Sequence, residues 1–114
     1  MTDEEVLTQS LDNQRALLRE FGPGLTLAGA MTFFAIALKK ETTQTKIAKF
    51  TGLSKYAVHR AVNTLEAANL VVLSPVSLVN AREKKVSLSP KGQKRLESLL
   101  LRLRNGSRKL RPIT

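Results

Sequence analysis

The alternation of apolar and polar positions along the chain predicts four helices in its first two-thirds. The first spans residues 4–20, where Leu residues recur at helical spacing after an acidic first turn. The second spans residues 26–40 and is apolar on nearly every side, as expected of a helix in the centre of a core. A third begins at Thr42 or Thr43 and ends near residue 50, and Ser54 then caps a fourth that ends near residue 69.

The remaining third of the chain predicts a β-hairpin and a last helix. Residues 71–73 are β-branched and strand-like, with Pro75 ending the strand or placing it at an edge, and residues 85–88 alternate polar and apolar. Ser89-Pro90 is a cap followed by proline at the first helical position, which predicts a helix to residue 104. We expect the helix to break at Asn105-Gly106, leaving a basic, flexible tail over residues 105–114.

Charge adds what the hydrophobic pattern does not show. The 114 residues include 19 Lys and Arg against 9 Asp and Glu, a net charge of +10. Residues 1–38 carry two basic and five acidic side chains, whereas residues 39–114 carry seventeen basic and four acidic ones. A charge of this sign and size indicates a polyanionic partner, either nucleic acid or an anionic membrane, that meets the later part of the chain.

Several classes of function are disfavoured. The apolar stretch of residues 25–38 is shorter than the roughly 20 residues of a spanning helix, so no membrane partner is expected. The acidic N-terminus is unlike a signal peptide, which predicts a cytoplasmic protein. With no Cys, one His and scattered acidic residues, we expect no metal site, no cofactor, no catalytic residues and no enzyme activity. Aromatic residues make up only 4%, too few for a single-strand stacking surface.

Residues 44–63 have the spacing of a helix-turn-helix unit. Such a unit needs a small residue where its helices cross, a turn residue that tolerates positive φ, and a branched apolar residue facing back. Ala48, Gly52 and Val58 stand at those places. The side chains expected to point inward from the second helix are Val58, Ala61, Val62, Leu65 and Ala68.

The opposite face of the second helix is the candidate DNA-binding site. Its members are side chains that hydrogen-bond base edges or phosphates: Ser54, Lys55, Tyr56, His59, Arg60 and Asn63. Arg pairs with guanine and Asn with adenine in the major groove, and a helix N-terminus with a Lys suits phosphate. Two alternatives remain open: the hairpin is a generic amphipathic one with a solvated polar face, or Tyr56 is a packing residue.

A longer set of motifs resembles the winged helix-turn-helix of MarR-type bacterial regulators. The matching residues are Thr43-Gln44-Thr45-Lys46-Ile47-Ala48, Leu53-Ser54, Leu65, Leu70-Val71, Asn80-Ala81-Arg82 and Val86-Ser87-Leu88-Ser89-Pro90-Lys91-Gly92. The resemblance implies a mainly α fold with a small β-hairpin (α+β), with the helix-turn-helix at about residues 43–69 and the wing at about 70–89 in one domain over residues 1–104.

The resemblance also implies that the wing binds DNA. Its candidate residues are Asn80, Arg82, Lys84 and Lys85, with Arg82 reaching a minor groove. A lone Arg at a hairpin tip suits a narrow, negative groove, although a solvated turn Arg paired with Glu83 is the alternative. The sequence departs from the family at Asn80, where Asp is usual, at Leu73, where Arg is usual, and at Asn69, where Gly is usual.

These observations predict a protein that binds double-stranded DNA in sequence-specific fashion, as a transcriptional regulator and more readily a repressor than an activator. We expect a homodimer, held by the first and last helices, at the nucleoid of a bacterium, or encoded by a phage or plasmid. A replication, partition, packaging or architectural DNA-binding factor is the first alternative, and a winged-helix protein-interaction module is the second. The sequence identifies no small-molecule effector.

Overall fold

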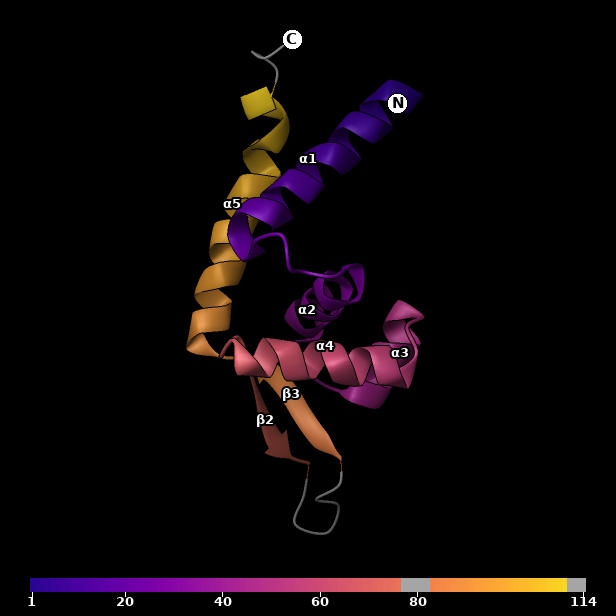
Figure 1. Ribbon diagram of the computed structural model, residues 1–114, viewed down its shortest axis with the longest axis vertical. Coiled ribbons are helices and arrows are strands. Elements are labelled where there is room, and N and C mark those ends of the chain that lie inside the picture. The colour runs from indigo at the N-terminus through magenta and orange to yellow at the C-terminus, as the bar shows by residue number, and fades with distance from the viewer. Residues whose placement is uncertain (77–82, 111–114) are drawn as a thin grey trace. The chain divides into compact units, whose positions relative to one another are not determined.

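The computed structural model describes the backbone of residues 1–76 and 83–110, and the side chains of residues 1–76 and 83–105. The elements are α1 (Asp3–Phe21), α2 (Leu27–Lys39), β1 (Glu41–Thr43), α3 (Gln44–Thr51), α4 (Lys55–Ala67), β2 (Val71–Pro75), β3 (Lys84–Leu88) and α5 (Pro90–Leu110). Figure 1 labels all of them except β1. The chain divides into two compact units, one of Met1–Leu25 with Arg95–Thr114 and one of Thr26–Lys94.

The core of the unit Thr26–Lys94 forms where α4 packs on α2 (Figure 1). Phe33, Ile36, Val58, Val62 and Val86 are all fully buried there. The apolar run of α2 therefore places this helix centrally, as predicted. Its two ends differ from the prediction, because Leu27 and Leu38 are 72% and 69% exposed.

A three-stranded antiparallel sheet in the order β1-β3-β2 completes this unit. Thr42 and Leu73 both pair with Val86, so β3 is the central strand and Pro75 ends an edge strand, where its missing N–H costs nothing. The sequence did not predict β1, and Thr42 is strand rather than helix. Thr43 ends β1 and also caps α3, because its Oγ1 accepts a hydrogen bond from the Lys46 backbone N–H at 3.3 Å.

Local caps and turns form the helix-turn-helix as predicted. The Ser54 Oγ accepts from the Ala57 N–H at 3.1 Å and starts α4. Gly52 adopts φ +81° between α3 and α4, the left-handed conformation that the turn needs. Asn69 has φ +62° just after α4 and so replaces the usual glycine without breaking the turn.

The segment between β3 and α5 holds the C-terminal end of α4. The Ser89 Oγ donates to the Asn69 carbonyl and accepts from the Gly92 N–H, the latter at 2.9 Å. The Lys91 ammonium donates to the Ala68 carbonyl at 3.0 Å, where the end of the helix dipole is negative. Ser89, Lys91 and Gly92 thus join the end of α4 to the start of α5.

The unit of Met1–Leu25 and Arg95–Thr114 is joined by one buried carboxylate. Glu20, near the end of α1, has a side chain 8% exposed and accepts from the Ser98 Oγ at 2.8 Å and from the Arg102 Nε at 2.9 Å. Its backbone carbonyl accepts from the Arg95 guanidinium at 2.7 Å. These bonds link α1 to α5 within the unit and employ two of the basic residues of α5.

The Leu stripe of α1 is not covered within one copy of the chain: Leu7, Leu11 and Leu18 are 51–69% exposed, whereas Asp12 and Ala16 are buried. One prediction for the terminal helices is wrong. The last helix does not break at Asn105-Gly106 but continues to Leu110. A glycine inside a helix costs only about 1 kcal/mol, which the helix-favouring Leu, Arg and Lys residues around it offset.

Candidate nucleic-acid interface

The buried and exposed faces of α4 separate the side chains that build the core from those that meet solvent. Val58, Ala61, Val62 and Leu65 are at most 6% exposed. The six predicted site residues Ser54, Lys55, Tyr56, His59, Arg60 and Asn63 are all exposed. Ala68 was expected to point inward, but it follows the last turn of α4 as its C-cap and is exposed.

Tyr56 and Arg60 lie one turn apart on the exposed face and contact each other. Tyr56 is 69% exposed and therefore does not pack into the core, which removes the alternative reading of this residue. The Arg60 guanidinium carbon lies 5.7 Å from the centroid of the Tyr56 ring, a cation–π distance. The ring thus restricts an otherwise flexible Arg side chain that can take guanine bidentately.

His59 and Asn63 belong to a hydrogen-bonded set that includes a residue the sequence did not single out. The His59 Nδ1 lies 3.2 Å from the Gln44 Oε1, and the His59 Nε2 lies 3.2 Å from the Asn63 Nδ2. Gln44 is the first residue of α3, so this contact joins the two helices of the motif on their exposed side. The feature of the sequence that could have pointed to Gln44 is its place directly after the Thr43 cap, at the start of the first helix of the pair.

The wing residues have different surroundings. Lys84 is exposed, whereas the Lys85 ammonium forms an ion pair with the Glu41 carboxylate of β1 at 3.1 Å. Asn80 and Arg82 lie outside the described residues. Lys84 and Lys85 therefore stand at the loop end of the hairpin, where β3 begins, and the second already has a partner.

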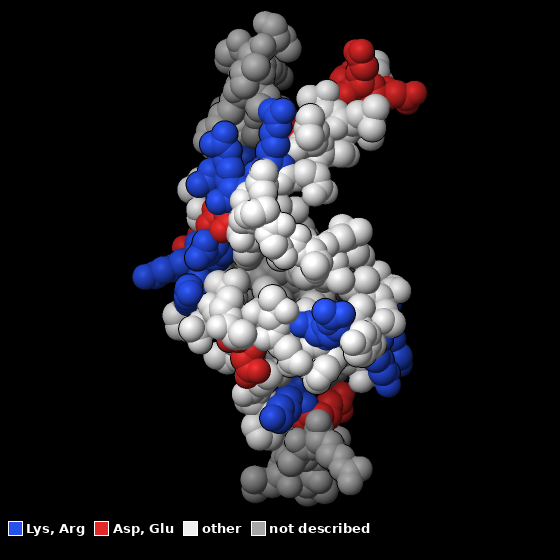
Figure 2. Space-filling model, viewed as in Figure 1, with Lys and Arg blue, Asp and Glu red and all other residues white. Residues whose placement is uncertain are grey.

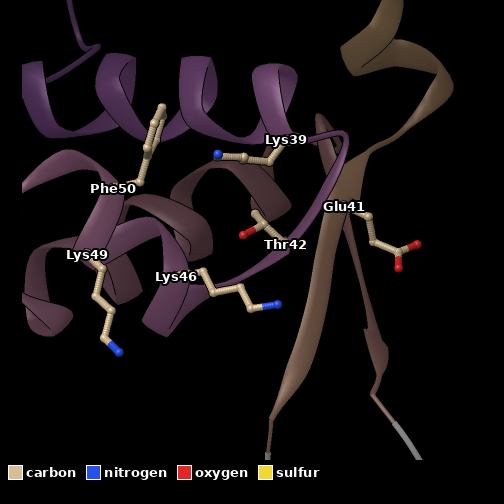
Figure 3. A pocket seen from close by; sticks show the side chains of 6 residues that line it. All are labelled: Lys39, Glu41, Thr42, Lys46, Lys49 and Phe50. Atoms are coloured by element: carbon tan, nitrogen blue, oxygen red, sulfur yellow. The ribbon is translucent and has the colours of Figure 1, made fainter.

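A hollow of about 500 Å³ lies beside α3, lined by Lys39, Glu41, Thr42, Lys46, Lys49 and Phe50 (Figure 3). The Lys39 ammonium reaches across to the Phe50 ring, 4.4 Å from its centroid, while Glu41 points away from the hollow. Lys46 follows Gln44 by two residues, and two residues correspond to a rotation of roughly 200° around an α-helix. The two side chains therefore leave α3 on opposite sides. The hollow is thus basic but faces away from the side of α3 that contacts His59.

Basic side chains also gather along α5, as Figure 2 shows.

Within the described ranges, no group of three or more His, Cys, Asp or Glu side chains lies close enough to hold a metal ion. None of the helices in the described part of the chain is long and apolar enough to span a membrane.

Comparison with known proteins agrees with this geometry. Residues 24–77 match the model of the MarR family, a segment that holds α2, β1, α3, α4 and β2. No curated protein matches the chain. The predicted resemblance to the MarR family is thereby confirmed for the segment that carries the helix-turn-helix.

Solved structures extend the likeness over nearly the whole chain. The transcriptional regulator Tm0710 from Thermotoga maritima is 21% identical, with a TM-score of 0.74 over 94% of this chain and 72% of its own. RV1404 from Mycobacterium tuberculosis is 14% identical, with a TM-score of 0.82 over 97% and 75%. A MarR mutant from E. coli, solved with operator DNA, is 17% identical, with a TM-score of 0.68 over 90% and 73%. At such identities the likeness establishes the fold, which is the winged helix-turn-helix predicted from the sequence.

Proposed function

We propose that this protein is a transcriptional regulator that binds double-stranded DNA in sequence-specific fashion and acts by occupying a promoter. The observation that carries the proposal is the separation of faces on α4. Four apolar side chains are buried on one side, while Ser54, Lys55, Arg60 and Asn63 stand exposed on the other. A helix with this polar face enters a major groove and reads base edges, with its N-terminus toward the phosphates.

The wing supplies the second contact in this proposal. Lys84, at the start of β3, meets the DNA backbone, and Arg82 enters the flanking minor groove. Bound protein then excludes polymerase from the promoter, which makes repression the expected outcome. The match to the MarR family over residues 24–77 supports this reading, as does operator DNA in the solved E. coli relative.

We further propose that two copies pair through α1 and α5 and read an inverted repeat with half-sites about one helical turn apart. Leu7, Leu11 and Leu18 on α1 are more than half exposed, and an apolar stripe of that kind is costly in water unless it is covered.

The experiment that tests DNA recognition is selection from random duplex DNA, followed by binding curves on the selected site and on a scrambled one. Arg60→Ala should cost about 1–3 kcal/mol on the selected site and lower the selected-to-scrambled ratio. Arg104→Ala is the matched control, because it removes an exposed Arg from α5. Failure to enrich any sequence, or an Arg60→Ala ratio equal to that of the native protein, would contradict the proposal.

Sedimentation at micromolar concentration tests the dimer separately. The native chain should sediment as a dimer, and Leu7→Glu with Leu11→Glu should sediment as a folded monomer, since both side chains are exposed within one copy. Leu38→Glu, an equally exposed Leu of α2, should remain a dimer. A native chain that sediments as a monomer both with and without DNA would rule out the inverted-repeat arrangement.

A further inference from the structure

The contact between Gln44, His59 and Asn63 constrains where protons lie. The Gln44 Oε1 is a carbonyl oxygen, which only accepts, so the His59 Nδ1 that faces it at 3.2 Å carries a proton and donates. In a neutral imidazole the other nitrogen is then an acceptor. The Asn63 Nδ2, which lies 3.2 Å from the His59 Nε2, therefore donates to it. Hydrogen bonds run in one direction, from Asn63 through His59 to Gln44.

This direction determines what Asn63 presents to a DNA groove. One N–H of its carboxamide is held by His59, and its Oδ1 and second N–H remain available. An acceptor beside a donor is the combination that pairs with the N6 amino group and N7 of adenine. Were the imidazole proton on Nε2, His59 would instead hold the Asn63 Oδ1, and only the amino group would face outward. That arrangement suits the O6 and N7 acceptors of guanine.

We propose that Gln44 is a positioning residue for DNA recognition, which through the His59 imidazole orients the Asn63 carboxamide to select adenine over guanine. The inference rests on the proposed function and names the base chemistry of that same site. Gln44 needs no base contact for this role. It acts by offering a hydrogen-bond acceptor to the His59 Nδ1, which keeps the proton on that nitrogen. The His59 Nε2 is then the acceptor that orients Asn63.

The test replaces Gln44 by residues with different hydrogen-bonding groups and measures base preference at the position that Asn63 reads. That position is first identified as the one whose preference disappears in Asn63→Ala. Selection and binding curves are run at pH 8 for every variant. Gln44→Glu keeps an acceptor toward Nδ1 and should retain the adenine preference, which for a good bidentate pair is about tenfold.

Gln44→Lys offers only donors, so Nδ1 must accept, Nε2 must carry the proton, and the Asn63 carboxamide must turn over. Its preference should move from adenine toward guanine at that one position. Gln44→Ala should reduce the preference to within about threefold, since the imidazole is no longer held in one tautomer. When each of the three Gln44 substitutions is combined with His59→Ala, the three double variants should share the same base preference. The imidazole that links Gln44 to Asn63 is then absent.

The base preference is the ratio of the affinities for two DNA sites that differ at one position. The charge that Glu or Lys adds changes both affinities alike, so its effect cancels from the ratio. If Gln44→Lys and Gln44→Glu share the native preference while Asn63→Ala loses it, the positioning role is wrong and the proposed function stands. If the native protein selects no sequence at all, the proposed function fails instead. A salt-dependent loss of binding by Gln44→Glu with unchanged preference in Gln44→Lys would assign Gln44 to a phosphate contact and overturn the inference.

Discussion

Replacing Gly92 by Ala tests how tightly the hairpin and α5 are joined to the end of the recognition helix. A Cβ built on Gly92 would collide with the backbone carbonyl oxygen of Leu70 and lie 2.9 Å from its carbonyl carbon. Both atoms are backbone, so no flexible side chain can move aside. The same Leu70 carbonyl accepts a hydrogen bond from the Ser89 N–H at 3.0 Å, and any shift of Leu70 weakens it.

The expected magnitude follows from three contributions. Overpacking of a well-packed site costs about 1–3 kcal/mol. A weakened backbone hydrogen bond adds about 1 kcal/mol, and the better helix propensity of Ala over Gly offsets about the same amount. Gly92→Ala should therefore lower the free energy of unfolding by about 1–3 kcal/mol, with a fall in Tm of roughly 4 °C for each kcal/mol.

Gly24→Ala is the matched control for this experiment. No atom lies within 4 Å of the Cβ that Gly24 would gain, and its φ is not in the left-handed region. Its free energy of unfolding should be unchanged or higher by about 0.4–1 kcal/mol, through the less flexible unfolded chain. Urea unfolding of the three proteins measures both effects. A Gly92→Ala variant as stable as Gly24→Ala would refute the close approach of α5 to Leu70.

Three further outcomes are expected. Glu20→Ala removes the acceptor shared by Ser98 and Arg102 and should cost about 1–3 kcal/mol in urea unfolding; an unchanged midpoint would mean that α1 and α5 are not joined there. Ala48→Leu should cost about 1–3 kcal/mol in thermal melts by overpacking the helix crossing, and a neutral result would place Ala48 outside it. Lys55→Ala should flatten the dependence of DNA affinity on salt more than Lys46→Ala does, because Lys46 lines the hollow beside α3 and not the exposed face of α4. Equal effects of the two substitutions would mean that the hollow also contacts DNA.

The helix-turn-helix was predictable because its geometry depends on local chemistry. Ser54 and Thr26 cap helices with a hydrogen bond three residues away, and Gly52 supplies a left-handed turn that few other residues tolerate. The apolar spacing of α4 determines its buried face in the same way. Such signals act within about one helical turn, so they are visible in a single sequence.

Features that depend on distant partners could not be predicted. β1 is three residues long and exists because Thr42 lies opposite Val86, 44 positions later in the chain. The spacing of apolar residues on α1 does not by itself show whether a helix face is covered by its own chain or left exposed. The contact of Gln44 with His59 likewise depends on the angle at which α3 and α4 cross, which the spacing of residues does not specify.

The structure also changes how much of the positive charge is available to DNA. Five basic residues of the helix-turn-helix, the predicted wing and the start of α5 are candidate phosphate or groove contacts: Lys55, Arg82, Lys84, Lys85 and Lys91. Lys85 is ion-paired with Glu41, and Lys91 donates to the carbonyl that ends α4, so each already has an internal partner. Three contacts per copy remain, or about six in a dimer, for which log K should fall against log salt with a slope of about −5.

Lys91→Met tests whether the Lys91 ammonium stabilises the C-terminal end of α4 or binds a DNA phosphate. If its ammonium serves the end of α4, this variant should lose stability while its salt slope stays near that of the native protein. If it binds phosphate instead, the slope should flatten by about 2 in a dimer and the melting temperature should hold. A native slope flatter than about −2 would contradict DNA binding altogether and favour a protein partner for the exposed face of α4.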